Sequence, residues 1–196
     1  MIRHIYTPAG WAWALACAAL SPGCATPDMP VAPAAFYLSS PSLADNAALQ
    51  QRHAGNFKKN PNCRGDNVSP PLQWSNVPAQ SRSLVLLMDD QAGRSGLGVS
   101  HLVVYGIPTT VAGLAEGELA APPTAGRFVA GKNSLGLAYL GPCPPLGNAP
   151  QHYVFSLIAT DLAADALPPG LGREDLMKAL QGHAVGATTV VFRYAH

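Results

Sequence analysis

Two carboxylates and an imidazole near the middle of the chain are the side chains best suited to chemistry. Asp89 and Asp90 end the apolar run 83–90, and His101 begins the apolar run 101–108. An imidazole beside a carboxylate can exchange a proton with it or be held by it in one orientation. The same pair can also hold an anion without reacting with it. These residues therefore indicate a polar site, with binding and acid–base catalysis both open.

The two apolar runs must be strands if these side chains are to meet. Each run is short and rich in aliphatic and β-branched residues, and a glycine-rich stretch at 93–98 separates them. Such runs between turn residues favour buried strands over helices. If the runs pair as a hairpin with a long loop, Asp89, Asp90 and His101 lie at the same end of one sheet.

Other segments complete a mainly β pattern. Further strands are expected at 36–38, 72–74, 152–160 and 188–194. One helix is expected at 173–181, where Gly182 ends it. Residues 120–131 carry no periodic pattern and are expected to form a loop. The 19 glycines and 19 prolines along the chain suit short strands and structured loops better than a helical bundle.

A proline-rich segment, Gly141–Gly147, can be neither a helix nor a central strand. Proline fixes φ and has no N–H group, so this segment is expected to be a rigid loop with several free backbone groups. A rigid loop of this kind is suited to form the wall of a pocket.

The composition argues against several classes of function. The chain has 196 residues, about one domain, of which 12% are charged, and its formal net charge is +1. This balance gives no electrostatic footprint for nucleic acid, and no run of Lys and Arg marks an acidic membrane surface. His101, His152 and His183 lie on separate segments without metal-site spacing, so neither a metal nor another cofactor is expected.

The N-terminus has the pattern of a secretory signal peptide. Basic residues precede the apolar run 11–20, which is shorter than the ~20 residues that span a bilayer, and small residues follow it. We expect residues 1–25 to be a signal peptide and 26–35 to be a flexible linker, which indicates a periplasmic protein. Cys24 lies in a Gly-Cys-Ala step similar to a bacterial lipoprotein box. A lipidated Cys24 and an unlipidated product therefore both remain open.

Cys63 and Cys143 are the only cysteines beyond this N-terminal segment. In an oxidising compartment, two such thiols are expected to form an intramolecular disulfide. The alternative is a pair of buried, unpaired thiols that behave as small hydrophobes.

An ordered set of motifs gives the sequence a family resemblance. The motifs are Ser69-Pro-Pro-Leu-x-Trp74, Asp89-Asp90, His101-Leu-Val-Val-Tyr-x-Ile-Pro108, Gly141-Pro-Cys-Pro-Pro-x-Gly147, Tyr153-Val-Phe and Leu176…Gly182-His183. From residue 36 to 196, the chain resembles the bacterial branch of the phosphatidylethanolamine-binding protein family, also called Raf-kinase-inhibitor-like proteins. The resemblance implies a mainly β domain, with a large antiparallel-rich central sheet, a smaller sheet packed on it and a few short helices.

The resemblance also implies an anion-binding pocket at the sheet edge. Its expected residues are Asp89, Asp90, His101, Gly141, Cys143, Pro144, Pro145, Gln151 and Tyr153. Three departures from the family pattern imply a smaller, less aromatic and less charged pocket. Gln91 follows the aspartates in place of the usual Pro-Asp-Ala-Pro, Val99 replaces a tryptophan, and Gln151 replaces a histidine, with His152 displaced by one position.

Residues and resemblance together predict non-catalytic binding of a small anion, of the phosphate or phosphoethanolamine-headgroup type, with a regulatory role open. A protonated His101 would be the main partner of the anion, with backbone N–H groups near Gly141 and Cys143 as further donors. Two alternatives remain: a peptidase inhibitor or other protein-interaction module acting through the loop 120–132, and a hydrolase that uses His101 and Asp90. The absence of a Gly-x-Ser-x-Gly motif disfavours the hydrolase.

Overall fold

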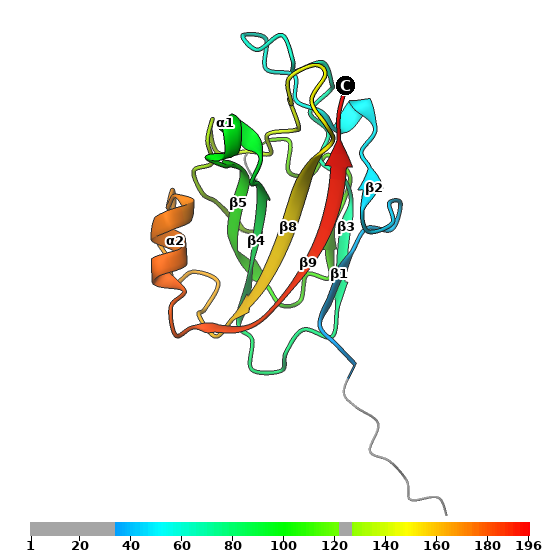
Figure 1. Cartoon of the computed structure of the whole chain (residues 1–196). Helices are drawn as coiled ribbons and strands as arrows, with labels where there is room; N and C mark the ends of the chain where they lie inside the picture. Colours follow the sequence, from blue (N-terminus) through cyan, green and yellow to red (C-terminus); the bar gives the residue numbers. More distant parts are fainter. Residues whose placement is uncertain (1–33, 122–126) are drawn as a thin grey trace, which may run out of the picture. The chain divides into compact units, whose positions relative to one another are not determined.

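The computed structural model describes residues 34–121 and 127–196, which form two packed β-sheets and a few short helices (Figure 1). This architecture confirms the expected mainly β fold. The expected signal peptide, Cys24 and most of the linker lie outside the described residues. Within the described ranges, no helix is long and apolar enough to cross a membrane.

The larger sheet has six strands in the order β2-β9-β8-β4-β5-β7. Among the described strands of this sheet, only the β2–β9 pair is parallel, so the sheet is mixed but mostly antiparallel. Its strands are β2 (Ala47–Ala48), β9 (Ala184–Tyr194), β8 (Gln151–Thr160), β4 (Ser83–Asp90), β5 (Val99–Pro108) and β7 (Val129–Ala130). Because β4 is antiparallel to both β5 and β8, the last residues of β4 and the first residues of β5 and β8 lie at the same end of the sheet, at the top of Figure 1.

The smaller sheet has three antiparallel strands in the order β1-β3-β6. They are β1 (Tyr37–Ser39), β3 (Leu72–Ser75) and β6 (Gly113–Leu114). Leu72 and Trp74 alternate inward, as the sequence predicts, and both are buried. The indole N–H of Trp74 donates to the carbonyl oxygen of Val111 at 2.8 Å, so its one polar atom is satisfied. Trp74 is therefore a core residue.

Strands β4 and β5 are apolar along their length because both faces of the larger sheet are covered. Leu86 and Met88 belong to the core shared with the smaller sheet. Val85 and Leu87 face the other way and pack with α2 (Arg173–Ala179). Burial of each such side chain contributes roughly 1.5–3 kcal/mol. Packing on both faces thus fixes the strand ends that carry the polar residues.

Helix α2 forms where the sequence predicts a helix, although it ends two residues earlier, at Ala179. Glu174 and Asp175 lie in its first turn, where the helix dipole favours negative charge. Gly182 follows the helix with a φ of 81°, a left-handed value that glycine adopts without strain. The other helices are η1 (Gln51–His53) and α1 (Gly93–Gly96).

The segment expected to be a loop at 120–131 contains a strand. Val129 and Ala130 form β7, which pairs with β5 at the edge of the larger sheet. A two-residue strand is too short to show a periodic pattern in the sequence, and β7 forms because it pairs with the backbone of β5. Residues 122–126 lie outside the described residues, so the inhibitor-loop hypothesis remains a prediction.

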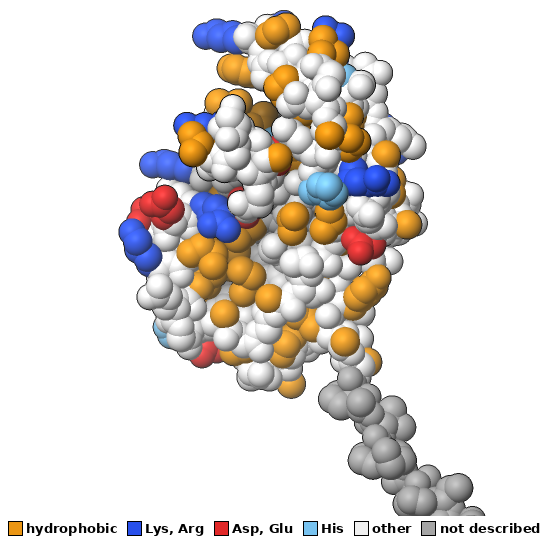
Figure 2. All heavy atoms as spheres, viewed as in Figure 1, with side chains coloured by type: hydrophobic (Ala, Val, Ile, Leu, Met, Phe, Trp, Pro, Cys, Tyr) orange, Lys and Arg blue, Asp and Glu red, His pale blue; other side chains and the backbone are white. Residues whose placement is uncertain are grey.

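Charged side chains are interspersed on the face shown in Figure 2. Lys and Arg side chains lie among acidic and apolar ones there and do not gather into one stripe. This pattern agrees with the formal net charge of +1 and gives this face no electrostatic footprint for nucleic acid.

Candidate functional site

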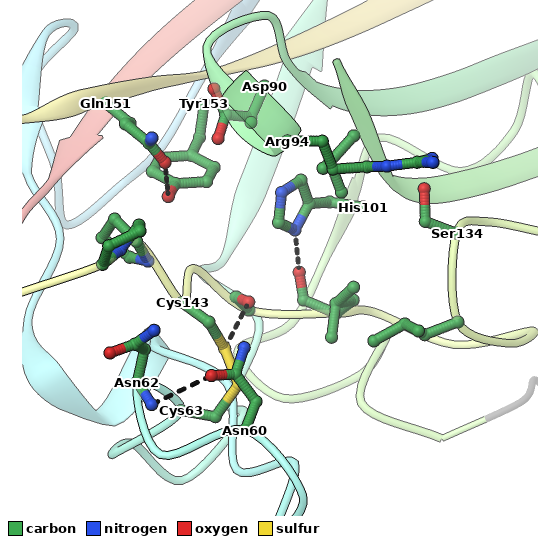
Figure 3. A pocket seen from close by; sticks show the side chains of 17 residues that line it. Asn60, Asn62, Cys63, Asp90, Arg94, His101, Ser134, Cys143, Gln151 and Tyr153 are labelled. Carbon is green, nitrogen blue, oxygen red and sulfur yellow. Dashed lines mark hydrogen bonds between the residues drawn. A yellow bond between two sulfur atoms is a disulfide. The ribbon is translucent and has the colours of Figure 1, made fainter. Parts of the chain in front are cut away.

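Three strand ends bring most of the predicted polar residues around one cavity of about 500 Å³ (Figure 3). Asp90 ends β4, His101 lies near the start of β5, and Tyr153 lies near the start of β8. The other predicted residues that line the cavity are Gly141, Cys143, Pro144, Pro145 and Gln151. The volume falls within the ~300–1,000 Å³ typical of small-molecule sites.

A β-bulge turns His101 towards this cavity. In the pairing of β4 with β5, Met88 lies opposite Leu102 and Asp89 lies opposite Ser100, so His101 has no partner. At such a bulge two successive residues oppose a single residue on the neighbouring strand, and the bulged strand bends. His101 therefore faces the same side of the sheet as Leu102, although the two are neighbours in sequence.

Asp89 lies outside the cavity, in contrast to the expectation from the sequence. Successive strand residues point to opposite faces, so Asp89 and Asp90 diverge. Both carboxylate oxygens of Asp89 accept from Nε of Arg173, at 3.0 and 3.1 Å. Ser100 pairs with Asp89 and shares its face, away from His101. The candidate hydroxyl and the candidate base of the hydrolase hypothesis are therefore on opposite faces of the sheet.

Asp90 is the buried carboxylate of the cavity, with a relative exposure of 2%. Its Oδ1 accepts from the backbone N–H of Ala92 at 2.9 Å. Its Oδ2 lies near Gly93, where an added Cβ would stand 3.1 Å from Oδ2 and 2.6 Å from a methyl group of Val99. Glycine at position 93 therefore keeps the space beside Oδ2 open.

His101 is 5% exposed and has one ring nitrogen already committed. Nδ1 donates to the carbonyl oxygen of Leu140 at 2.7 Å, and the ring meets that of Tyr153 edge-on with 5.2 Å between centroids. Burial lowers the pKa of His101 below its ordinary value of 6.5, although the Leu140 carbonyl and Asp90 favour the charged form. The imidazole is therefore mostly neutral at pH 7, which corrects the expectation of a protonated His101.

Tyr153 and Gln151 form a polar pair on β8. The Tyr153 hydroxyl donates to Oε1 of Gln151 at 3.2 Å. Burial, and secondarily the negative charge of Asp90, raise the pKa of Tyr153 well above its ordinary value, so the hydroxyl stays protonated. His152 is exposed, because its side chain points to the opposite face of the strand. Gln151 thus occupies the cavity position and His152 does not replace it.

Sequence reasoning missed the cation of the cavity. Arg94 is the only Lys or Arg that lines the cavity within the described chain. In Figure 3 its side chain extends past His101 in the direction of Ser134. Arg94 and Ser95 have φ values of 52° and 60°, which residues other than glycine rarely adopt. The signal in the sequence was an arginine inside the glycine-rich turn that follows Asp90.

Of the further lining residues that were missed, four come from loops without a recognisable motif. They are Asn60, Asn62, Ser134 and Leu135. The first two flank the backbone turn before Cys63, and the other two precede the proline-rich wall. The loops were expected from the sequence, but not the side of the molecule on which each would lie.

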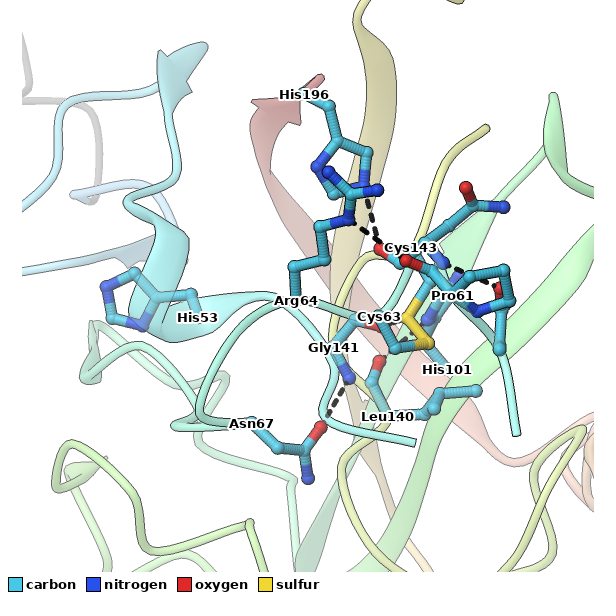
Figure 4. Close-up of a disulfide and its surroundings, with 12 residues drawn as sticks. His53, Pro61, Cys63, Arg64, Asn67, His101, Leu140, Gly141, Cys143 and His196 are labelled. Atoms are coloured by element: carbon cyan, nitrogen blue, oxygen red, sulfur yellow. Dashed lines mark hydrogen bonds between the residues drawn. A yellow bond between two sulfur atoms is a disulfide. The ribbon is translucent and has the colours of Figure 1, made fainter. Parts of the chain in front are cut away.

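A disulfide between Cys63 and Cys143 fixes one wall of the cavity (Figure 4). The bond confirms the predicted pairing and joins two segments that lie 80 residues apart in the sequence. The segments approach closely: a Cβ at Gly55 would stand 2.5 Å from Sγ of Cys143. Glycine at this position is therefore part of the wall's construction.

Backbone hydrogen bonds also brace this wall. The N–H of Gly141 donates to the side-chain oxygen of Asn67 at 2.9 Å. This N–H is therefore already used, whereas the sequence led us to expect a free donor for an anion near Gly141. The N–H of Gly55 donates to the carbonyl oxygen of Pro142 at 2.9 Å. The N–H of Cys143, in contrast, has no acceptor in the part of the chain that the structure describes.

Similarity to known proteins places the chain in a family. Residues 39–195 match the family described as phosphatidylethanolamine-binding protein. The chain belongs to the phosphatidylethanolamine-binding protein family. Membership supports a binding role in general. No group of three His, Cys, Asp or Glu side chains able to hold a metal ion occurs within the described ranges.

Relatives of this family member occur in bacteria and archaea. A UPF0098 protein of Methanothermobacter thermautotrophicus is 40% identical over 137 residues, which cover 67% of this chain and 85% of the relative. LppC of Mycobacterium tuberculosis, named as a candidate lipoprotein, is 36% identical over 163 residues, covering 82% of this chain and 73% of LppC.

Solved structures of other family members share this fold. YbcL of E. coli, described as a new member of the mammalian PEBP family, superposes with a TM-score of 0.73 at 25% identity. The alignment covers 83% of this chain and 99% of YbcL. The homologue CT736 of Chlamydia trachomatis gives a TM-score of 0.69 at 28% identity, covering 83% of this chain and 98% of CT736.

Proposed function

We propose that the cavity binds a small oxyanion of the phosphate type, free or as part of a phospholipid headgroup, without turning it over. The observation that carries this proposal is the convergence of Arg94, His101 and Asp90 on one cavity of ligand size. The family description points in the same direction, since a phosphatidylethanolamine headgroup carries a phosphate.

Arg94 supplies the positive charge that an anion needs. A neutral His101 carries no charge and the carboxylate of Asp90 repels an anion, so the guanidinium of Arg94 is the main group that attracts the anion. Its planar N–H groups match the geometry of phosphate oxygens and form stronger hydrogen bonds than neutral donors do. The exposed position of Arg94 at the cavity lets it reach a ligand that enters from solvent.

The other walls contribute shape and further polar contacts. Pro144 and Pro145 have no N–H, so they limit the space without donating hydrogen bonds. The N–H of Cys143 is available as a donor. The carboxylate of Asp90 suits the ammonium group of a phosphoethanolamine headgroup, with the phosphate towards Arg94.

Several features support binding without turnover. Acyl or phosphoryl transfer to the protein needs an activated nucleophile beside a base. Ser100 faces away from His101, and Tyr153 keeps its proton. The hydroxyl of Ser134 accepts the backbone N–H of Ser100 at 3.1 Å and has no hydrogen bond to an imidazole or carboxylate among the described residues.

Arg94→Ala tests this function directly. Loss of a hydrogen bond to a charged group should weaken phosphate or phosphoethanolamine binding about 10- to 150-fold. Isothermal titration calorimetry of the folded, oxidised protein measures this affinity. In the same samples, incubation with phosphate and carboxylate esters should release no product.

Arg82→Ala is the matched control for this experiment. Arg82 is exposed next to the start of β4, at the opposite end of the strand from Asp90, and its loss changes the net charge by the same amount. Its replacement should leave the affinity within about twofold of wild type. The length of β4 separates Arg82 from the cavity, which is more than the Debye length of ~8 Å at physiological salt. Equal affinities of wild type and Arg94→Ala, or no binding by wild type, would contradict the proposal.

We also propose that the protein is exported, with lipidation at Cys24 still open. The N-terminal pattern motivates this proposal, and the name of LppC and the disulfide both agree with it. A lipid anchor would hold the anion-binding domain close to a membrane surface.

A further inference from the structure

The buried end of the cavity carries hydrogen-bond acceptors that have no donor. Oδ2 of Asp90 receives no hydrogen bond from the described residues, whereas Oδ1 takes the N–H of Ala92. Asp90 is 2% exposed and its side chain lines the cavity, so this oxygen meets mainly what occupies the cavity and little bulk solvent. A buried carboxylate oxygen in this state favours a ligand that brings a donor.

The free nitrogen of His101 is an acceptor as well. Because Nδ1 donates its proton to the carbonyl oxygen of Leu140, the neutral ring leaves a lone pair on Nε2. Nε2 has no hydrogen-bond partner in the described part of the chain, and the side chain lines the cavity. His101 and Asp90 therefore present acceptors of the same kind from neighbouring strands.

A fully ionised oxyanion has no hydrogen-bond donor to offer these two acceptors, so its contact with them is unfavourable. Sulfate carries no proton at neutral pH, so its oxygens would be held against a carboxylate and an imidazole lone pair. Inorganic phosphate keeps at least one proton throughout the neutral range, whereas a phosphate monoester, whose second pKa is near ~6, has mostly lost its last P–O–H proton at pH 7. The proton on inorganic phosphate can be donated to Asp90 or to His101 while Arg94 contacts the other oxygens.

We propose that the cavity selects ligands that donate a hydrogen bond to Asp90 and His101, and so accepts phosphate and rejects sulfate. This inference rests on the proposed oxyanion-binding function and defines its ligand class. The donor can be a P–O–H group or the ammonium of an aminoethyl headgroup, since both offer a proton to the same acceptors. A site built to pair with a ligand hydrogen discriminates strongly against an analogue without it, here by about 100-fold or more.

The selectivity should weaken in acid. The charged or titratable groups near His101 are Asp90 on β4, Tyr153 on β8 and Arg94 between β4 and β5, with Asp89 acting from the opposite face of the sheet. Because the pKa of His101 lies below its ordinary value, Nε2 becomes a donor only at lower pH. Sulfate should therefore bind measurably better in acid than at neutral pH.

Four probe ligands and one substitution test this inference by calorimetry near neutral pH. The ligands are inorganic phosphate, phosphoethanolamine, inorganic sulfate and 2-aminoethyl sulfate, of which the last has an ammonium group but no acidic O–H. Wild type should bind phosphate about 100-fold or more tightly than sulfate. Binding of 2-aminoethyl sulfate would identify ammonium as the donor, whereas rejection of it would identify the P–O–H group.

Asp90→Asn is the decisive variant, because the amide adds N–H donors at nearly constant volume. It should admit sulfate and lower the phosphate-to-sulfate affinity ratio at least about tenfold. Asp89→Asn is the matched control: it removes the same charge from the opposite face and should leave the ratio unchanged. Should Asp90→Asn fail to fold, the wild-type ratio and its loss in acid remain as the test.

Three outcomes overturn the inference. Equal binding of phosphate and sulfate by wild type would remove the selectivity while leaving oxyanion binding intact. An unchanged ratio in folded Asp90→Asn would show that Asp90 does not set it. No binding of any of the four ligands by wild type would overturn the proposed function as well.

Discussion

At the scale of single residues, the protonation state of His101 determines how the cavity can work. A buried imidazole that donates from Nδ1 to Leu140 has an acceptor, not a positive charge, to offer a ligand at neutral pH. In the proposed site, positive charge comes from Arg94 and a second acceptor from Asp90, both of which line the cavity. This division of roles follows from burial, which penalises the charged form of a histidine by more than the nearby carboxylate restores.

The same burial predicts how stability depends on pH. The unfolded chain binds a proton at His101 near the ordinary pKa of 6.5, whereas the folded protein binds it only at lower pH. Unfolding therefore takes up a proton between these two values, so stability is full above pH 6.5 and falls as the pH drops below it. The limiting slope is about 1.4 kcal/mol per pH unit for each such histidine.

Urea denaturation at a series of pH values measures this slope, and His101→Asn should reduce it. His53 is also buried, and burial lowers its pKa as well, so it should account for part of the remaining slope. Exposed His152 provides a matched control, and His152→Asn should leave the slope unchanged. An unaltered slope in His101→Asn would mean that the imidazole is not held neutral by burial.

At the scale of elements, the sequence predicted the long strands well and the geometry of the site only partly. Strands β4, β5, β8 and β9 were predictable because their apolar runs are long enough to show a pattern. The bulge at His101 was not, because it depends on which residues of β4 and β5 pair. Strand alternation alone would have separated Asp89 from Asp90, which the sequence analysis treated as one cluster.

Arg94 shows a second limit of sequence reasoning. The glycine-rich stretch around it was expected only as the connection between two strands, and the structure forms the short helix α1 there, with left-handed values at Arg94 and Ser95. Such a connection carries no periodic pattern that indicates a facing direction. The position of Arg94 at the cavity depends on left-handed backbone values at Arg94 and Ser95 and on the space at Gly93. The two-residue strands β2, β6 and β7 escaped prediction for a related reason, since each is ordered by a longer neighbour.

The disulfide between the two wall segments makes an element-scale prediction. It closes a loop with a sequence separation of 80 residues, for which the chain-entropy account gives about 4.5 kcal/mol of stabilisation. A Cys63→Ser and Cys143→Ser double variant should therefore melt roughly 10–15 °C below the oxidised wild type. Its affinity for phosphate should also fall, because Asn60 and Asn62 lie on the segment released.

Thermal melts with and without a reductant provide the control for this prediction. Reductant should lower the melting temperature of wild type to near that of the double variant, and should leave the double variant unchanged. Equal melting temperatures of the oxidised wild type and the double variant would show that the bond adds no stability.

At the scale of the whole molecule, packing on both faces of the larger sheet explains why a few polar residues at its strand ends can form a defined site. The larger sheet is covered by the smaller sheet on one face and by α2 with its connecting loops on the other. Strand ends at its edge are therefore fixed by core packing, and loops from distant parts of the sequence close over them.

Export is the prediction that belongs to the entire chain. The basic start and short apolar run predict removal of about 17–25 residues during secretion. Mass spectrometry of the protein from its native host should show a mature chain that lacks Met1, and a diacylglycerol-modified Cys24 would establish lipidation. An intact N-terminus on the secreted protein would refute this prediction.

The most direct test of oxyanion binding is a crystal structure of the oxidised protein with phosphate. Our account predicts a phosphate in the cavity, with one oxygen within ~2.7–3.2 Å of a guanidinium nitrogen of Arg94 and another oxygen at a similar distance from Nε2 of His101. A phosphate bound elsewhere on the protein, with this cavity filled only by solvent, would contradict it.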